Sequence, residues 1–316
     1  MAALIARQQF PWSLTGNQRL AWYSPARAAF VIGNHADKCI LAANGSAAPM
    51  PLVTRADGYA QKTSAYDDQL PPADFEEVRK YGVDGFQLLT AVQYDAAFAG
   101  EKWGSVCPVD QALISGLTCK VPVLHPTSGA IVSMADKKLV LHSLEAKTFA
   151  TVAEAKLRGP MTAIQAAPSQ PVIYYGTNAG DVYSVAVLPD KLGPQKKVGA
   201  FGRVVNSIRH TTDGQHLIVG GMGFVAMLSL AGKAPEIVAK LDTSCRSIHV
   251  LNDRWLLLNQ GMHGLTLCEM SNGQLRLDTT HKPTDAVDRI VCSTEGTKAL
   301  LLFQPPAGMA LYDIQV

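Results

Sequence analysis

The chain has 316 residues, of which 47% are hydrophobic and 17% are charged, and this composition excludes an intrinsically disordered protein. This length exceeds that of most single compact cores, so two domains are the first expectation unless the chain is built from repeats. The formal net charge of +2 gives no reason to expect a nucleic-acid or membrane partner, because either usually requires a concentrated basic surface.

The start of the chain has no basic segment followed by an apolar stretch, as a signal peptide would have. No run of about 18 apolar residues is present, so no membrane-spanning helix is expected and we predict a soluble, cytoplasmic protein. The cysteines form no C-x-x-C pair, and reduced, buried thiols are therefore predicted. The six are Cys39, Cys107, Cys119, Cys245, Cys268 and Cys292.

The predicted elements are short apolar strands separated by turns rich in Gly, Pro, Asp and Ser. Near the start, three strands are predicted at residues 19–24, 28–33 and 38–43. No long segment has the 3.6-residue period of a helix, so we expect an all-β protein. The three-strand pattern recurs at residues 123–144, 164–187, 208–230, 248–270 and 290–314.

One position near the end of each third strand measures the length of the repeat. Successive copies are separated by 41, 45, 40 and 44 residues at His142, Tyr183, Leu228, Cys268 and Tyr312. A β-propeller blade of four antiparallel strands takes roughly 40–45 residues. The repeat therefore predicts a β-propeller.

Three short motifs support this fold. The run Leu311-Tyr312-Asp313-Ile314 stands where WD-repeat proteins have their Trp-Asp pair, and the hairpin turns Thr212-Asp213-Gly214 and Thr294-Glu295-Gly296 fit the same pattern. On these residues the chain resembles the WD-repeat family of β-propellers over nearly its whole length. The resemblance implies a rigid propeller face that binds other proteins.

The blade count follows from the spacing. Between Ala43 and His142 lie 99 positions, which is two blade periods plus roughly 15 residues. We therefore expect an insertion at about residues 53–81, between the first and second blades, followed by an irregular blade at 82–118. Seven blades result, or six if that segment is not a blade.

The last copy has only three strands, and the N-terminal run at residues 3–10 is the candidate for the fourth. Pairing the two would remove two open sheet edges and close the ring. The chain is then one propeller domain, residues 1–316, and the two-domain expectation is abandoned.

The insertion is the first candidate surface for a partner. Pro72-Ala73-Asp74 followed by acidic residues predicts a short helix with Asp74 as its N-cap. Insertions in repeat proteins often lie on the binding face, and aromatic residues are enriched at interfaces. The alternative is a solvated loop without a partner. The candidate residues are Tyr59, Tyr66, Asp67, Asp68, Phe75, Arg79 and Tyr81.

Four arginines form the second candidate surface. Arg158, Arg203, Arg246 and Arg289 recur near the starts of successive first strands, 45, 43 and 43 residues apart. At such positions they would surround one mouth of the channel and favour an acidic segment or a phosphate. The alternative is that each arginine braces its neighbouring blade.

No motif predicts catalysis: H-E-x-x-H, G-x-S-x-G, G-x-G-x-x-G after a strand and a phosphate-binding G-K-[ST] loop are all missing. The turns before the third strands carry a mixed set of residues, so neither a metal nor a cofactor is predicted. Four histidines are interpreted as partly buried residues whose ring nitrogens are satisfied by backbone or neighbours. They are His125, His142, His210 and His249.

The function expected from the sequence is a non-catalytic scaffold or adaptor that binds another protein, with a monomer favoured. Two alternatives stay open. One is a propeller enzyme of the sugar-lactone hydrolase or lyase type, with its site at the channel mouth. The other is a bacterial accessory or immunity protein that binds one cognate partner.

Overall fold

In the computed structural model the regular secondary structure of the described part is almost entirely β-strand, arranged in six four-stranded antiparallel sheets and one two-stranded hairpin. The structure describes residues 2–10, 20–24, 29–33, 38–42, 47–49, 53–54, 60–61, 120–124, 131–135, 137–145, 148–232, 234–304 and 308–316. No helix in these ranges is long and apolar enough to cross a membrane.

The strands are given sheet by sheet. The first sheet contains β2 (Leu20–Ser24), β3 (Ala29–Gly33), β4 (Lys38–Ala42) and β5 (Ala47–Pro49), and the hairpin after it contains β6 (Val53–Thr54) and β7 (Ala60–Gln61). The next contains β8 (Lys120–Leu124), β9 (Ile131–Ala135), β10 (Lys138–Glu145) and β11 (Thr148–Lys156). It is followed by β12 (Met161–Ala166), β13 (Val172–Thr177), β14 (Asp181–Ala186) and β15 (Lys196–Ala200).

Three further sheets complete the described part. The first has β16 (Val205–His210), β17 (His216–Gly221), β18 (Phe224–Ser229) and β19 (Glu236–Leu241). The second has β20 (Ser247–Val250), β21 (Trp255–Asn259), β22 (Leu265–Ser271) and β23 (Gln274–His281), with the 3-10 helix η3 (Gly261–His263) before β22. The last combines β24 (Val287–Cys292), β25 (Lys298–Phe303) and β26 (Met309–Gln315) with β1 (Ala3–Phe10).

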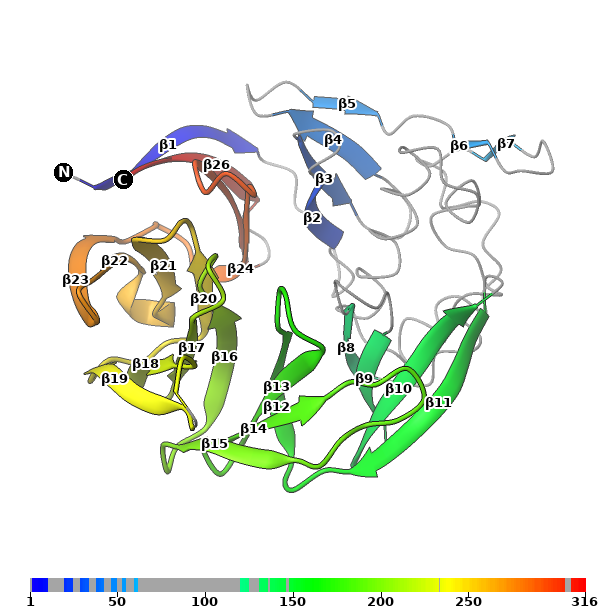
Figure 1. Ribbon diagram of the computed structural model, residues 1–316. Helices are drawn as coiled ribbons and strands as arrows, with labels where there is room; N and C mark the ends of the chain where they lie inside the picture. Colours follow the sequence, from blue (N-terminus) through cyan, green and yellow to red (C-terminus); the bar gives the residue numbers. More distant parts are fainter. Residues whose placement is uncertain are drawn as a thin grey trace.

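The sheets are arranged around a common centre, and their innermost strands are β2, β8, β12, β16, β20 and β24 (Figure 1). Inner strands of successive sheets contact one another, as β8 contacts β12, β12 contacts β16, and β16 contacts β20. At the other side β24 contacts β2. This is a β-propeller-like arrangement, and the all-β prediction is confirmed.

The structure differs from the sequence-based prediction at the first strands. β12 begins at residue 161 and β16 at residue 205, each three residues earlier than expected. In both strands a β-bulge follows the first residue, between Met161 and Ala163 and between Val205 and Ser207. A bulge interrupts the alternation of inward and outward side chains, so the apolar pattern begins only after it.

The two ends of the chain lie in one sheet, because β1 pairs antiparallel with β26 from Ala3 opposite Gln315 to Phe10 opposite Met309. The N-terminal run is therefore the fourth strand of the last sheet, as the sequence predicts. Ala2, which is 4% exposed, belongs to the hydrophobic cluster between this sheet and the preceding one. The predicted irregular blade at residues 82–118 lies outside the described residues.

Neighbouring sheets approach so closely at two glycines that an added side chain would have to displace its neighbour. A Cβ at Gly176 in β13 would lie 2.4 Å from Cγ1 of Val205 in the next sheet. At Gly220 in β17 it would lie 2.8 Å from Cδ1 of Ile248, again in the next sheet. The two glycines pair with Ala163 and Ser207 and hold equivalent places in their sheets. Small residues here allow the next inner strand to pack directly against the second strand.

Deleting residues 1–10 is expected to lower the melting temperature by roughly 5–10 °C, since the outer edge of β26 would lose its partner and the cluster around Ala2 would open. Differential scanning calorimetry measures the change. The control is Arg7→Ala, which removes only the exposed ion pair with Asp313 and is expected to cost about 0–1 kcal/mol. A deletion that melts like the intact protein would contradict the role assigned to β1.

Gly176→Ala is expected to lower the free energy of unfolding by about 1–3 kcal/mol, because the added methyl group must displace Val205. Gly159→Ala is the matched control: its Cβ would lie 3.4 Å from the nearest heavy atom, Cγ2 of Thr177, and we expect a change within about 0.5 kcal/mol. Urea unfolding of both variants distinguishes them. Equal stability of the two would show that the sheets are not closely packed at Gly176.

Candidate functional site

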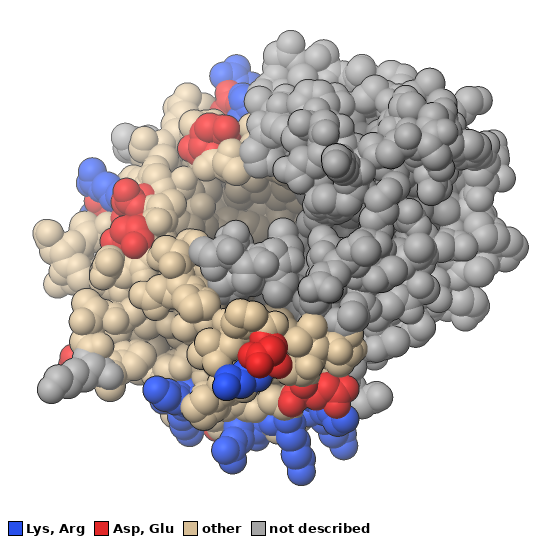
Figure 2. Space-filling model, turned by 45° about the vertical axis from the view of Figure 1, so that its right-hand side comes forward, with Lys and Arg blue, Asp and Glu red and all other residues tan. Residues whose placement is uncertain are grey.

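A cavity of about 620 Å³ lies where the inner strands β12, β16, β20 and β24 end. Its wall consists of the last residues of these strands and the turns that follow them. Figure 2 shows the hollow at the centre of the molecule, bordered on one side by described residues. The cavity is therefore at one end of the central channel.

Three polar side chains hold the same register position around this cavity. Gln165, Arg209 and His249 each lie in an inner strand, and all three line the cavity. Their partners in the adjacent second strands are Tyr174, Ile218 and Leu257, which are themselves equivalent. An amide, a guanidinium and an imidazole are thus presented at one level by three neighbouring sheets.

Arg209 carries the formal charge of the cavity. Its Nη1 donates to Ile208 O at 2.7 Å and to Gln165 Oε1 at 3.3 Å. No carboxylate of the described residues forms an ion pair with it, and its Nε and Nη2 groups have no acceptor among them. Burial lowers the pKa of the Arg209 guanidinium, which nevertheless stays charged at neutral pH.

The two histidines of the cavity are neutral at pH 7. Burial lowers the pKa of His210 to about 4, and burial together with the nearby Arg209 lowers the pKa of His249 to about 3. The His249 ring contacts Ser247 Oγ at 3.4 Å. Both ring nitrogens of His210 are buried without a hydrogen-bond partner, while its ring meets that of Tyr174 edge to face at 5.1 Å. The interpretation of His210 as a satisfied histidine is therefore wrong.

Cys292 completes this part of the wall with a neutral thiol, because burial raises its pKa to about 12. Cys245, Cys268 and Cys292 are all free, as predicted, and the other three cysteines lie outside the described side chains. No group of three or more potential metal ligands occurs among the residues that the structure describes.

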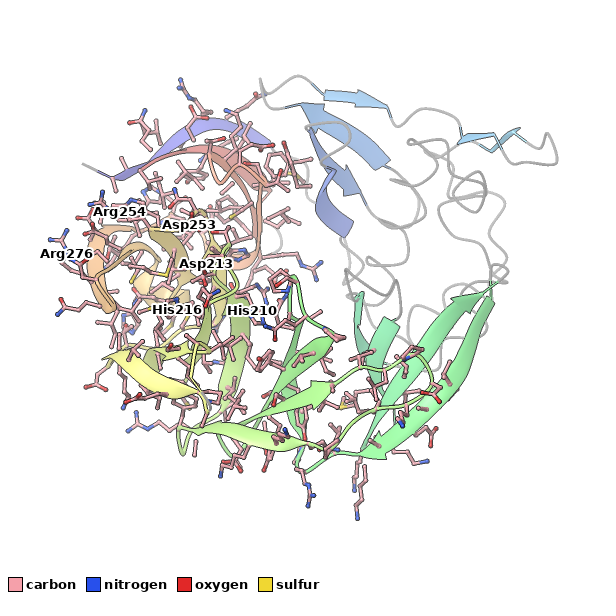
Figure 3. All side chains as sticks on the ribbon, viewed as in Figure 1. His210, Asp213, His216, Asp253, Arg254 and Arg276 are labelled. Carbon is pink, nitrogen blue, oxygen red and sulfur yellow. The ribbon has the colours of Figure 1, made fainter. Side chains whose placement is uncertain are left out.

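The carboxylates at this end of the ring belong to turns and are engaged there. Asp213 Oδ1 accepts hydrogen bonds from Thr211 Oγ1 and from Gln215 N, at 2.5 and 2.9 Å. Asp253 accepts from Thr212 of the neighbouring sheet. Figure 3 labels Asp213 and Asp253 near His210 at this end of the sheets. Neither carboxylate lines the cavity, so the described wall carries only the charge of Arg209.

Glu295, in the turn between β24 and β25, is engaged in the same way. Its Oε2 accepts a hydrogen bond from the Tyr23 hydroxyl at 3.1 Å, which joins this turn to the sheet of β2. The side chain of Glu295 does not line the cavity either. Each of the three turn carboxylates therefore has a hydrogen-bonded partner in the turns.

Three of the four predicted arginines lie at the opposite end of the inner strands. Arg158, Arg203 and Arg246 are exposed in or beside the loops that lead into β12, β16 and β20. Arg289 differs: it lies inside β24, opposite Leu302, and is partly buried. The expectation that all four lie at equivalent places is therefore wrong for Arg289, because the spacing of 43 residues ignores the differing loop lengths.

Arg203 and Arg246 each lie over a turn of their own sheet. A Cβ at Gly223 would lie 2.3 Å from Arg203 Nη1, and one at Gly261 would lie 2.9 Å from Arg246 Nε. At Arg158 the backbone N–H donates to the buried Tyr175 hydroxyl at 3.3 Å. These contacts tie each arginine to its own sheet, and the backbone of Arg203 also lies close to Gly180 in the turn between β13 and β14 of the preceding sheet.

Two methionines stand at the tips of the same turns. Met222 is 63% exposed and Met262 is 92% exposed. The two turns are connected, since Gly223 N donates to Ser244 Oγ at 3.0 Å in the loop that carries Arg246. We call Arg203, Met222, Arg246 and Met262 the methionine–arginine stripe. It extends over two adjacent sheets.

The stripe and Arg209 are functional candidates of which the sequence indicated only part. The sequence predicts Arg203 and Arg246 as binding residues, whereas Met222, Met262 and Arg209 are identified only by the structure. Gln165, Arg209 and His249 are 44 and 40 residues apart, which is the repeat length, so the period contained the signal. The insertion residues Tyr59, Tyr66, Asp67, Asp68, Phe75, Arg79 and Tyr81 lie outside the described residues.

The buried histidines are expected to make folding sensitive to acid. The unfolded chain binds their protons near pH 6.5 and the folded protein only near pH 4 or below, so stability is full above pH 6.5 and falls as the pH drops. His210→Phe should reduce the loss of unfolding free energy between pH 7 and pH 5 by about 2 kcal/mol, measured by urea unfolding at both values. His263→Gln, in an exposed turn, is the control. If the free energy of unfolding of His210→Phe depends on pH as that of the wild type does, then His210 is not buried as a neutral ring.

Comparison with known proteins gives a fold and no family. No protein-family profile matches the chain, and no curated protein matches it in sequence. Among solved structures 1517 chains match, so the architecture alone does not select a function. One is the crystal structure of a protein from Lactobacillus plantarum, with 11% identity, a TM-score of 0.53, and coverage of 62% of this chain and 68% of that one. The likeness supports the β-propeller-like fold alone.

Proposed function

We propose that this protein is a WD-repeat-like propeller of seven blades that closes through β1 and binds another protein without catalysing a reaction. Six four-stranded sheets are described. Residues 62–119, between the hairpin and β8, exceed the roughly 40–45 residues of one blade. A seventh blade there, preceded by the insertion, accounts for this length.

The methionine–arginine stripe carries the proposal. Monomeric proteins seldom expose large apolar side chains at neighbouring loop tips, and Met and Arg are both enriched at protein interfaces. Both methionines follow or precede a glycine with positive φ, +78° at Gly223 and +66° at Gly261, which fixes the turns. A rigid turn presents its side chain with little loss of conformational entropy on binding.

The chemistry of the stripe indicates the kind of partner. Arg203 and Arg246 form no ion pair with a described carboxylate. Asp242, the nearest acidic residue in sequence to Arg246, instead contacts Lys240 at 3.6 Å. Two cations alternating with two apolar tips match a protein segment that alternates acidic and apolar residues.

Placing a photo-crosslinking amino acid at Met222 or Met262, in cells that produce the protein, is expected to yield one discrete cross-linked species. Arg203→Glu with Arg246→Glu should abolish it by charge reversal. Cross-linkers at Ile237, exposed on the outer strand β19, serve as the matched control. Mass spectrometry of the adduct identifies the partner and its contact segment.

The same experiment decides between the stripe and the insertion. Suppose that a cross-linker at Tyr66 captures the partner and those at Met222 and Met262 do not. The binding surface would then be the insertion, and the proposal for the stripe would be refuted. Deleting residues 54–81 should then abolish capture without unfolding the protein.

The enzyme alternative would use the cavity at the other end of the channel. The described residues that line it include no carboxylate, and its two histidines have pKa values of about 4 and 3, too low for an effective general base at neutral pH. These features favour binding over acid–base chemistry.

A further inference from the structure

We propose that the cavity at the ends of β12, β16, β20 and β24 binds a small carboxylic acid, whose carboxylate pairs side-on with the Nε–Nη2 edge of Arg209. This site is separate from the methionine–arginine stripe, because it lies at the other end of the inner strands. It goes beyond the proposed function, which needs no small ligand.

The orientation of Arg209 is the first argument. Its Nη1 is held by the Ile208 carbonyl and by Gln165, so the guanidinium has a defined direction. The opposite edge, with one N–H on Nε and two on Nη2, has no acceptor among the described residues. That edge matches the two oxygens of a carboxylate, which it can bind through two parallel hydrogen bonds.

The charge of the wall selects a monoanion. Arg209 is the one charged residue among the described residues of the lining, since both histidines and the Cys292 thiol are neutral at pH 7. A carboxylate cancels this single charge. A phosphate dianion would leave one negative charge inside the cavity without a cation, which costs free energy in a desolvated site.

A second N–H group lies buried beside the cavity. His210 lines the cavity with both ring nitrogens unpartnered, and one of them carries a hydrogen in the neutral ring. If the ring turned toward the cavity, a ligand oxygen would accept from this N–H, for which the described residues offer no acceptor.

The size and the remaining wall indicate the rest of the ligand. A volume of about 620 Å³ falls within the roughly 300–1000 Å³ of small-molecule sites. Ala166, Pro168 and Val250 give the wall an apolar part. We therefore expect a carboxylic acid with a short apolar body.

Thermal unfolding with acetate, butyrate, hexanoate and benzoate at constant ionic strength tests the site, and the matching amides are the control ligands. Carboxylates should raise the melting temperature and the amides should not, because only the native state, and not the unfolded chain, binds the anion. Arg209→Met should weaken binding about tenfold to a hundredfold in calorimetric titration. Lys196→Met, which removes one positive charge from the exposed outer strand β15, should bind as the wild type does.

Two further measurements have readouts other than affinity. Without ligand, Arg209→Met should be more stable than the wild type, because the variant no longer holds a partly buried cation for which no described carboxylate is a partner. In NMR spectra at pH 7, saturating benzoate should shift the ring resonances of His249, which lies near Arg209, and benzamide should not.

If carboxylates and amides change the melting temperature equally, the proposal is overturned, even if Arg209→Met alters the stability of the protein. Stabilisation by inorganic phosphate but not by any carboxylate would also overturn it, in favour of a phosphate site. If Arg209→Met binds carboxylates with the affinity of the wild type, the carboxylate does not bind at Arg209 and the proposed site is wrong.

Discussion

The close packing of one sheet against the next is the constraint on which the rest of the structure depends. Each described hydrophobic cluster combines residues of two neighbouring sheets, as Val219 and Leu217 pack with Tyr174 of the preceding sheet. No sheet therefore buries its own apolar faces alone. At Gly176 and Gly220 the approach is so close that a methyl group would collide with the next inner strand. The core of this protein consists of the contacts between sheets, and each sheet depends on its neighbours for its stability.

This packing leaves only the strand ends free for function. An inner strand of six residues such as β16 spans roughly 20 Å, so the loops before it and the turn after it are at opposite ends of the channel. One end carries exposed methionines and arginines on rigid turns, and the other a recessed guanidinium among neutral groups. Exposed tips suit a macromolecular partner, whereas a recess suits a small ligand. The two sites can therefore act independently.

The sequence predicted the repeat and the all-β fold because the second and third strands are buried and keep their apolar runs, as β21 does from Trp255 to Leu258. It misplaced the starts of the first strands because bulges break the alternation there. The outer strands escaped detection because their side chains are mostly exposed, as in β19, where apolar Ile237 and Val238 face solvent. The repeat also indicated Arg203 and Arg246. It does not give the lengths of the loops that lead into the first strands, however, and so it grouped Arg289 with these two arginines.

Arg209 shows why a site inside a repeat is hard to identify by pattern alone. The equivalent positions in three other sheets hold Gln165, His249 and Val291, so the fold accepts an amide, an imidazole or an aliphatic side chain there. Nothing in the packing of β16 therefore requires a cation. A partly buried charge that the architecture does not need, and that no described carboxylate neutralises, lowers stability. Its presence is explained most directly by something that Arg209 binds.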